Sequence, residues 1–129
     1  MQPPIGTLEV LQAATAIAKT TQTLIGKEID CRGVRYLTLF FTYVKGDETG
    51  LIITPSVLDK SGGTAYPYAI QTATGGAITL TDTKITLTAN KSSYMTFDVE
   101  GVDFFKFTQG GSNNDGTPTG TLAASVLTK

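Results

Sequence analysis

Apolar and polar residues alternate along much of the chain. The clearest stretches are "VRYLTLFFTYV" at 34–44, "AITLTDTKITLTA" at 77–89 and "SYMTFDVE" at 93–100. A period of two places successive side chains on opposite faces of a pleated strand, so these stretches predict half-buried β-strands. Gly, Asp and Asn separate them about every eight to twelve residues, a spacing that is typical of sandwiches and barrels rather than of βαβ units. The pattern therefore predicts an all-β protein, a single antiparallel β-sandwich of about eight strands.

One domain with an extended N-terminal arm is expected. The chain of 129 residues is long enough to bury one hydrophobic core. Pro3 and Pro4 favour an extended start, so residues 1–7 are expected to form an arm that docks on a neighbouring subunit, with a loose tail as the alternative, and residues 8–129 the sandwich. The number of strands favours a jelly-roll-like sandwich, with an immunoglobulin-like sandwich as the alternative.

The stretch 34–44 is the most apolar of the predicted strands. It is too apolar for a strand with one face exposed to solvent, so we expect it to lie centrally in its sheet. The next run, "LIITPSVL" at 51–58, is expected to pair with it as a hairpin, with Gly46 at positive φ in the turn. Pro55 predicts a bulge, an edge position or the end of that second strand.

Two later stretches predict which side chains face the core. In 77–89 the inward residues are expected to be Ile78, Leu80, Ile85 and Leu87. The intervening "TDTK" shifts the alternation by one residue, which requires a bulge or a turn. Tyr66, Tyr68 and Ile70 are spaced by two and are expected to share a face, while Pro67 indicates an edge strand.

Composition narrows the classes of function. The chain has no His, the commonest general base and transition-metal ligand, and no Trp, a strong platform for sugars and cations. The net charge of −1 offers no basic surface to nucleic acid. No apolar run is long enough to span a bilayer, and "MQPPIGTLEV" lacks the features of a secretory signal. We therefore expect no enzyme activity, no cofactor, and neither nucleic acid nor membrane as a partner.

The densest charge lies in "TYVKGDETG" at 42–50. Calcium requires six to eight oxygen ligands at defined offsets, which the adjacent acids Asp47 and Glu48 do not supply because their side chains diverge. A solvated hairpin tip is the simpler interpretation, and a metal site is the alternative. We expect Lys45, Asp47 and Glu48 to be exposed and to contact a neighbouring subunit.

A second polar loop is predicted at "GGSNNDGTPTG", residues 110–120. It lacks the Gly-Lys-Thr ending and the following helix of a phosphate-binding loop. A flexible connection between strands is the simpler interpretation, and a nest that binds an ion is the alternative. If this loop has a role, contact with a partner through Asn113, Asn114 and Asp115 is favoured over catalysis.

Other reactive residues have simple structural explanations. The acids Asp98, Glu100 and Asp103 flank a predicted turn at Gly101, where solvated charge is ordinary, although paired carboxylates also hydrolyse glycosides. Cys31 is the single cysteine, so no disulfide forms within the chain, and without His it has no base to make it a nucleophile. We expect it to be a small buried thiol.

The central segment resembles a known group of proteins. "VRYLTLFFTYVKGDETGLIITPSVLD" and "YMTFDVEGVDFFKFTQGG" are similar to small β-sandwich proteins from the structural gene modules of tailed bacteriophages and prophages, over about residues 29–119. The resemblance implies a non-enzymatic virion protein, of the capsid decoration, head–tail joining or tail accessory type. It implies assembly in the bacterial cytoplasm with capsid, portal or tail proteins, in a homo-oligomer or symmetric array.

Assembly would use exposed arms and loops rather than a polar pocket. The candidate contact residues are Pro3, Pro4, Ile5, Lys45, Asp47, Glu48, Asn113, Asn114 and Asp115. A carbohydrate-binding module of a tail fibre or secreted enzyme is the alternative function. It would require Tyr66, Tyr68 and Tyr94 to form an exposed aromatic platform, whereas core packing is the commoner fate of such residues.

Overall fold

The computed structural model describes residues 6–19, 21–112 and 117–129, and all regular elements of this part are strands. The strands are β1 (Thr7–Ala16), β2 (Thr23–Leu24), β3 (Ile29–Asp30), β4 (Tyr36–Val44), β5 (Gly50–Leu58), β6 (Ala65–Pro67), β7 (Ala69–Thr74), β8 (Ala77–Asp82), β9 (Ile85–Leu87), β10 (Lys91–Asp98), β11 (Phe104–Ser112) and β12 (Thr121–Thr128). The predicted all-β class is confirmed. The described strands outnumber the expected eight because several contain only two or three residues.

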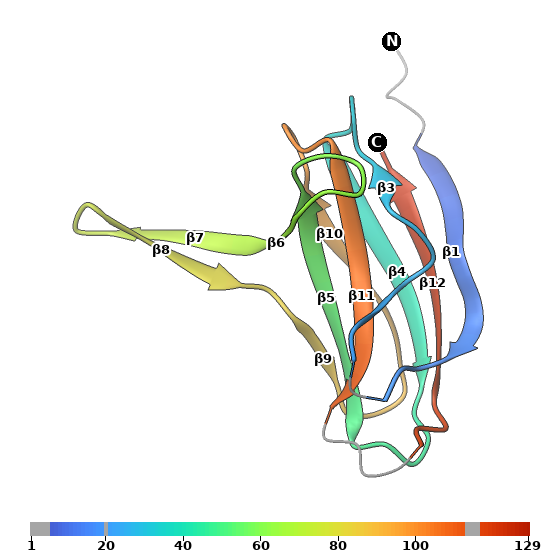
Figure 1. Ribbon diagram of the computed structural model, residues 1–129. Helices are drawn as coiled ribbons and strands as arrows, with labels where there is room; N and C mark the ends of the chain where they lie inside the picture. The colour runs from blue at the N-terminus through green and yellow to red at the C-terminus, as the bar shows by residue number, and fades with distance from the viewer. Residues whose placement is uncertain (1–5, 20, 113–116) are drawn as a thin grey trace.

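Two antiparallel sheets form the layers of a sandwich (Figure 1). Sheet A has the order β1-β12-β4-β10. Sheet B has the order β2-β11-β5-β6, with β3 also paired to β11 and β9 to β5. Among the described strands, β7 and β8 pair only with each other, and Figure 1 shows this ribbon projecting away from the sandwich. We call the ribbon from Ala69 to Asp82 the arm; it is a different segment from the N-terminal arm that was expected at residues 1–7.

Alternate side chains of both sheets form the core. In β4, burial follows the predicted period of two, and β4 lies centrally between β12 and β10, as expected. The rings of Tyr68, Phe97, Phe105 and Phe107 pack together with centroids 5.1 to 5.8 Å apart. Such pairs contribute about 0.5–1.5 kcal/mol each beyond their burial, so this cluster joins the two sheets strongly.

The predicted hairpin between 34–44 and 51–58 is wrong. β4 belongs to sheet A and β5 to sheet B, so the chain crosses between the layers where a hairpin tip was expected. Gly46 is also not among the described glycines with positive φ. Two strands that follow one another can turn back in one sheet or cross to the facing sheet, and both arrangements give the same alternation of side chains.

Pro55 interrupts the pairing at one edge of β5 without ending the strand. On that edge β9 pairs with Leu51–Ile53 and β6 with Ser56–Leu58. Pro55 lies in the gap, has no N–H to donate, and accepts a hydrogen bond of 3.1 Å through its carbonyl from the Tyr68 N–H. The chain leaves the sandwich at this gap as the arm and returns as β9.

The predictions about facing in 77–89 are half confirmed. Ile85 and Leu87 are half-buried and pack against the core. Ile78 and Leu80 are 69% and 64% exposed, so their predicted inward position is wrong. The reason is the shift at "TDTK", which ends β8 at Asp82 and places it in the arm rather than in a sheet with β9.

The prediction that Tyr66, Tyr68 and Ile70 share a face is also wrong. Tyr68 packs on the core, whereas Tyr66 and Ile70 are more than half exposed. β6 ends at Pro67 and β7 begins at Ala69, so no single strand gives the three side chains a common face. The predicted edge position of Pro67 is confirmed, because β6 is an outer strand of sheet B.

We expect Phe97→Ala to lower the free energy of unfolding by about 3–5 kcal/mol, because it leaves a cavity in the aromatic cluster. Phe40→Ala is the matched control, since Phe40 is 40% exposed on the outer face of β4 and its loss is expected to cost less than about 1.5 kcal/mol. Urea unfolding followed by circular dichroism measures both. Equal losses for the two variants would contradict this description of the core.

Candidate functional site

The crossing between β4 and β5 is organised around the carboxylate of Glu48. This side chain is only 3% exposed, so the prediction that Glu48 is exposed is wrong. Its Oε1 accepts hydrogen bonds from the backbone N–H groups of Thr119 (3.2 Å) and Gly120 (2.9 Å). Its Oε2 accepts from the Gly46 N–H (2.8 Å) and from the Tyr43 hydroxyl. One carboxylate thus joins the crossing to the start of β12.

These partners keep Glu48 ionised. Burial raises its pKa, but the hydrogen bonds from Tyr43 and from the backbone N–H groups of Gly46, Glu48 itself and Gly120 outweigh burial and lower the pKa to about 2. The pKa of Tyr43 rises, because its hydroxyl is desolvated and donates to Glu48. These donors all stabilise the charged form, so the carboxylate acts as a fixed structural acceptor rather than as a proton carrier.

Glycine is required at two points of this crossing. A Cβ on Gly46 would collide with the Thr119 side chain and the Gly120 backbone, and a Cβ on Gly120 would collide with Glu48. Neither position depends on positive φ, so the need is for close approach of the backbones. The charged segment 42–50, which was expected to be a solvated hairpin tip with a metal site as the alternative, instead connects the two layers.

The other predicted contact residues have different positions. Lys45 is half-buried, and its Nζ donates to the Gly46 carbonyl (3.2 Å), while Asp47 is exposed. Contact of these two with a neighbouring subunit stays a prediction. Outside the described residues lie the remaining candidates, Pro3, Pro4, Ile5, Asn113, Asn114 and Asp115.

The acids near Gly101 are exposed around a turn. Asp98 accepts from the Glu100 N–H (3.0 Å), and Glu100 pairs with Arg35 at 3.5 Å. Gly101 has φ of 84°, as a tight turn requires. Searching the described ranges reveals no group of three or more His, Cys, Asp or Glu side chains that could hold a metal ion.

Cys31 is buried, as predicted. Burial, together with the negative charge of Asp30, raises the pKa of its thiol to about 11, which disfavours the reactive thiolate. Among the described elements there is also no helix long and apolar enough to cross a membrane.

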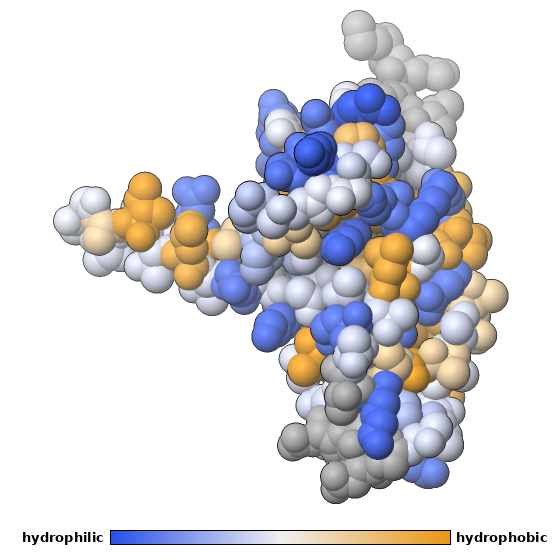
Figure 2. Space-filling model, in the orientation of Figure 1, coloured by the Kyte–Doolittle hydropathy of each residue, from blue (hydrophilic) through white to orange (hydrophobic). Residues whose placement is uncertain are grey.

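The arm carries large apolar side chains in solvent. Ile70, Ile78 and Leu80 are 55%, 69% and 64% exposed, and Figure 2 shows hydrophobic surface along the projecting ribbon. Its two strands meet at Gly75 and Gly76, which have φ of 58° and 83°. Positive φ at both positions is the geometry of a tight two-residue hairpin turn.

The pairing register divides the arm into two faces. Residues directly opposite each other in a ladder share a face, so Ala73 lies with Ile78, and Gln71 with Leu80. This side, which we call the apolar face, is made of Ala69, Gln71, Ala73, Ile78, Leu80 and Asp82. The opposite face carries Ile70 and mostly threonines. Asp82, at the base, is the one charged residue in the sequence of the arm.

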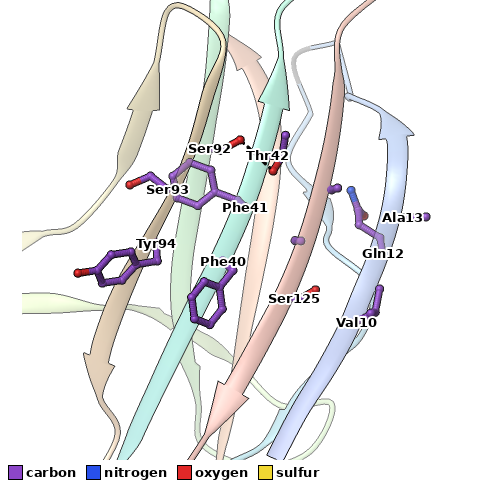
Figure 3. A pocket seen from close by; sticks show the side chains of 12 residues that line it. Val10, Gln12, Ala13, Phe40, Phe41, Thr42, Ser92, Ser93, Tyr94 and Ser125 are labelled. Atoms are coloured by element: carbon purple, nitrogen blue, oxygen red, sulfur yellow. Dashed lines mark hydrogen bonds between the residues drawn. The ribbon is translucent and has the colours of Figure 1, made fainter.

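A shallow trough of about 460 Å³ lies on the outer face of sheet A (Figure 3). The register explains its shape, because Val10, Ser125, Phe40 and Tyr94 are successive partners across the four strands. Small residues of β12 form the floor, whereas Val10 and the aromatic pair form the sides. The Phe40 and Tyr94 rings are 6.1 Å apart. Among the described residues lining the trough, none is charged.

The three tyrosines considered for a sugar platform do not meet. Tyr66 is 53% exposed on β6 of sheet B, and Tyr94 is 66% exposed on β10 of sheet A. Tyr68 packs edge-on against Phe97 of the core. The exposed aromatic pair is Phe40 with Tyr94, which the sequence analysis did not single out.

The arm was missed as well, although the sequence contains its signal. "TATGGAITL" has two glycines between stretches of β-forming residues, which is a hairpin pattern. The trough has no comparable signal, because its residues come from four strands that are distant in sequence.

Comparison with known proteins gives a match of fold. The crystal structure of the SPBc2 prophage-derived protein YomS is similar to this chain, with a TM-score of 0.58 and 19% sequence identity over 99% of this chain and 96% of that chain. At this identity the two chains are shown to share a fold. No protein-family model matches the sequence. A search of curated proteins also finds no match.

Glu48→Gln is expected to lower the free energy of unfolding at pH 7 by about 1–3 kcal/mol, because an amide replaces an oxygen that accepts from two donors. The lowered pKa means that the Glu48 contribution is present above pH 4.5 and is lost as the pH falls through about 2. The variant should therefore lose less stability between these pH values than the parent. Urea unfolding from pH 7 to pH 2 measures both effects.

Asp47→Asn is the matched control, because it removes an exposed carboxylate from the same crossing. It is expected to change stability by less than about 0.5 kcal/mol. Some acid sensitivity should remain in every variant, since hydrogen bonds from Arg32 lower the pKa of Asp30 to about 2. A Glu48→Gln protein with unchanged stability and unchanged pH dependence would contradict the structural role of Glu48.

Proposed function

We propose that this chain is a non-enzymatic structural protein of a bacteriophage particle. It assembles by protein–protein contacts on the capsid or at the head–tail junction, in a decoration or joining role. Its partners are capsid, portal or tail proteins and further copies of itself, and it joins the particle in the cytoplasm of the bacterial host. The arm is its principal contact element.

The arm is the observation that carries this proposal. A two-stranded ribbon is at best marginally stable by itself in water, and it becomes stable when it packs on another surface. Here the ribbon exposes Ile70, Ile78 and Leu80. Apolar side chains gathered on a projecting element are typical of surfaces that bind another protein.

Two further observations support the phage assignment. YomS, whose fold this chain shares over nearly its whole length, is described as a prophage-derived protein. The segments "TYVKGDETG" and "YMTFDVEGVDFF" resemble phage structural proteins. Glu48, one of the three charged residues of the first segment, is buried in the joint between the layers, so in this chain the segment serves the fold rather than a catalytic site.

A carbohydrate-binding module is the second candidate, and the trough favours it. The exposed Phe40–Tyr94 pair offers two aromatic rings in an open hollow, as sugar-binding sites do. In this case Tyr94→Ala would abolish glycan binding on an array, whereas Tyr66→Ala, on the other sheet, would preserve it. Absence of glycan binding by the parent protein counts against this candidate.

Removing the arm tests the structural role. Tyr68 accepts a hydrogen bond through its carbonyl from the Thr83 N–H (2.8 Å), so replacement of residues 69–82 by Gly-Gly closes the chain without stretching it. We expect the shortened protein to fold with an unchanged melting temperature, because the aromatic cluster is intact. We expect it to lose co-sedimentation with phage particles that lack this protein.

Lys60→Ala, in the exposed turn before β6, is the control and should co-sediment like the parent. The parent should also self-associate in size-exclusion chromatography with light scattering. A shortened protein that is folded and still binds particles like the parent would overturn the role of the arm. A parent protein that is a strict monomer and does not bind particles would overturn the proposed function.

A further inference from the structure

The arm and the trough are two apolar surfaces of the same chain that are left uncovered. We infer that the apolar face of the arm docks in the trough of a second copy of this chain. The inference rests on the proposed function and specifies which surfaces make the contact between copies.

The shapes of the two surfaces suit each other. The arm is a narrow ribbon, with about 20 Å of strand on each side of its turn. The trough is an open hollow of about 460 Å³ that runs over four strands. Ile78 and Leu80 project side by side from the apolar face. In the trough, the small Ser125 on β12 leaves room between Val10 and the Phe40–Tyr94 pair (Figure 3), and Ala123 of the same strand also lines it.

The chemistry of the two surfaces also agrees. The described lining of the trough has no charge, and the arm has only Asp82, at its base. Contact therefore buries no unpaired ion at the trough, which would otherwise oppose association. Ile78 and Leu80 would exchange water for the rings of Phe40 and Tyr94, a gain that grows with the apolar area removed from water.

Three of the polar side chains that line the trough already have hydrogen-bond partners within the protein, which favours a protein over a sugar as the occupant. The Thr42 and Ser92 hydroxyls are hydrogen-bonded to each other at 3.2 Å. The Gln12 amide donates to the Leu122 carbonyl at 2.8 Å. A sugar requires polar groups that are free to bind its hydroxyls, whereas an apolar ribbon requires a surface whose polar groups are already satisfied.

The geometry makes the contact directional. The arm leaves sheet B beside β6 and projects away from the sandwich (Figure 1). The trough is lined by residues on the outer face of sheet A. Each copy thus offers one arm and one trough at different places on its surface. Contacts of this head-to-tail kind close into rings, or continue as open arrays when the rotation between copies does not close.

Complementation between two variants tests this directional contact. The arm variant is Ile78→Lys with Leu80→Lys, and the trough variant is Val10→Lys with Tyr94→Lys. All four residues are at least 64% exposed, so both variants should fold. Each alone should self-associate at least about tenfold more weakly than the parent in light scattering. Their equimolar mixture should form a heterodimer, because the intact arm of one fits the intact trough of the other.

Val44→Lys is the matched control, since Val44 is 50% exposed on β4 but does not line the trough. It should associate like the parent. An arm variant that loses association while the trough variant keeps it would overturn the inference and leave the proposed function standing. A parent protein that binds particles but is monomeric by itself would likewise overturn the inference and leave the proposed function standing. A monomeric parent that binds glycans, with binding lost in the trough variant, would overturn both.

Discussion

The buried carboxylate of Glu48 is the interaction on which the two-layer arrangement depends. The chain passes from sheet A to sheet B after β4, and backbone N–H groups lie outside the strand pairing both in this passage, at Gly46, and before β12, at Thr119 and Gly120. Glu48 accepts from three of them and from the Tyr43 hydroxyl. An unpaired buried donor would cost about 1–3 kcal/mol, so a single side chain removes several such penalties at once.

The trough on sheet A and the arm that projects from sheet B have separate structural origins. The trough results from cross-strand register, because β1, β12, β4 and β10 align Val10 and Phe40 on either side of the small Ser125. The arm results from an interruption, since Pro55 offers no N–H where β9 gives way to β6. The side chains of the core pack against one another, whereas the trough and the arm both expose apolar surface.

If the protein assembles as proposed, this division separates the parts that stabilise the fold from the part that makes the contact. The aromatic cluster around Phe97 and the crossing at Glu48 hold the sandwich without help from the arm, which pairs only with itself among the described strands. An element that contributes little to the core can present its side chains to a partner at small cost to the fold.

The sequence by itself determined the strand class, the central position of β4 and the burial of Cys31, because alternation and residue type act locally. It did not determine that β4 and β5 lie in different sheets, since a hairpin and a crossing have the same alternation. That choice, made by tertiary contacts with β12, also decided that Glu48 is buried rather than solvated. Tertiary structure likewise placed Ile78 and Leu80 outside the core. It also brought together the residues of the trough from four strands, because the local sequence pattern does not specify the order of strands in a sheet.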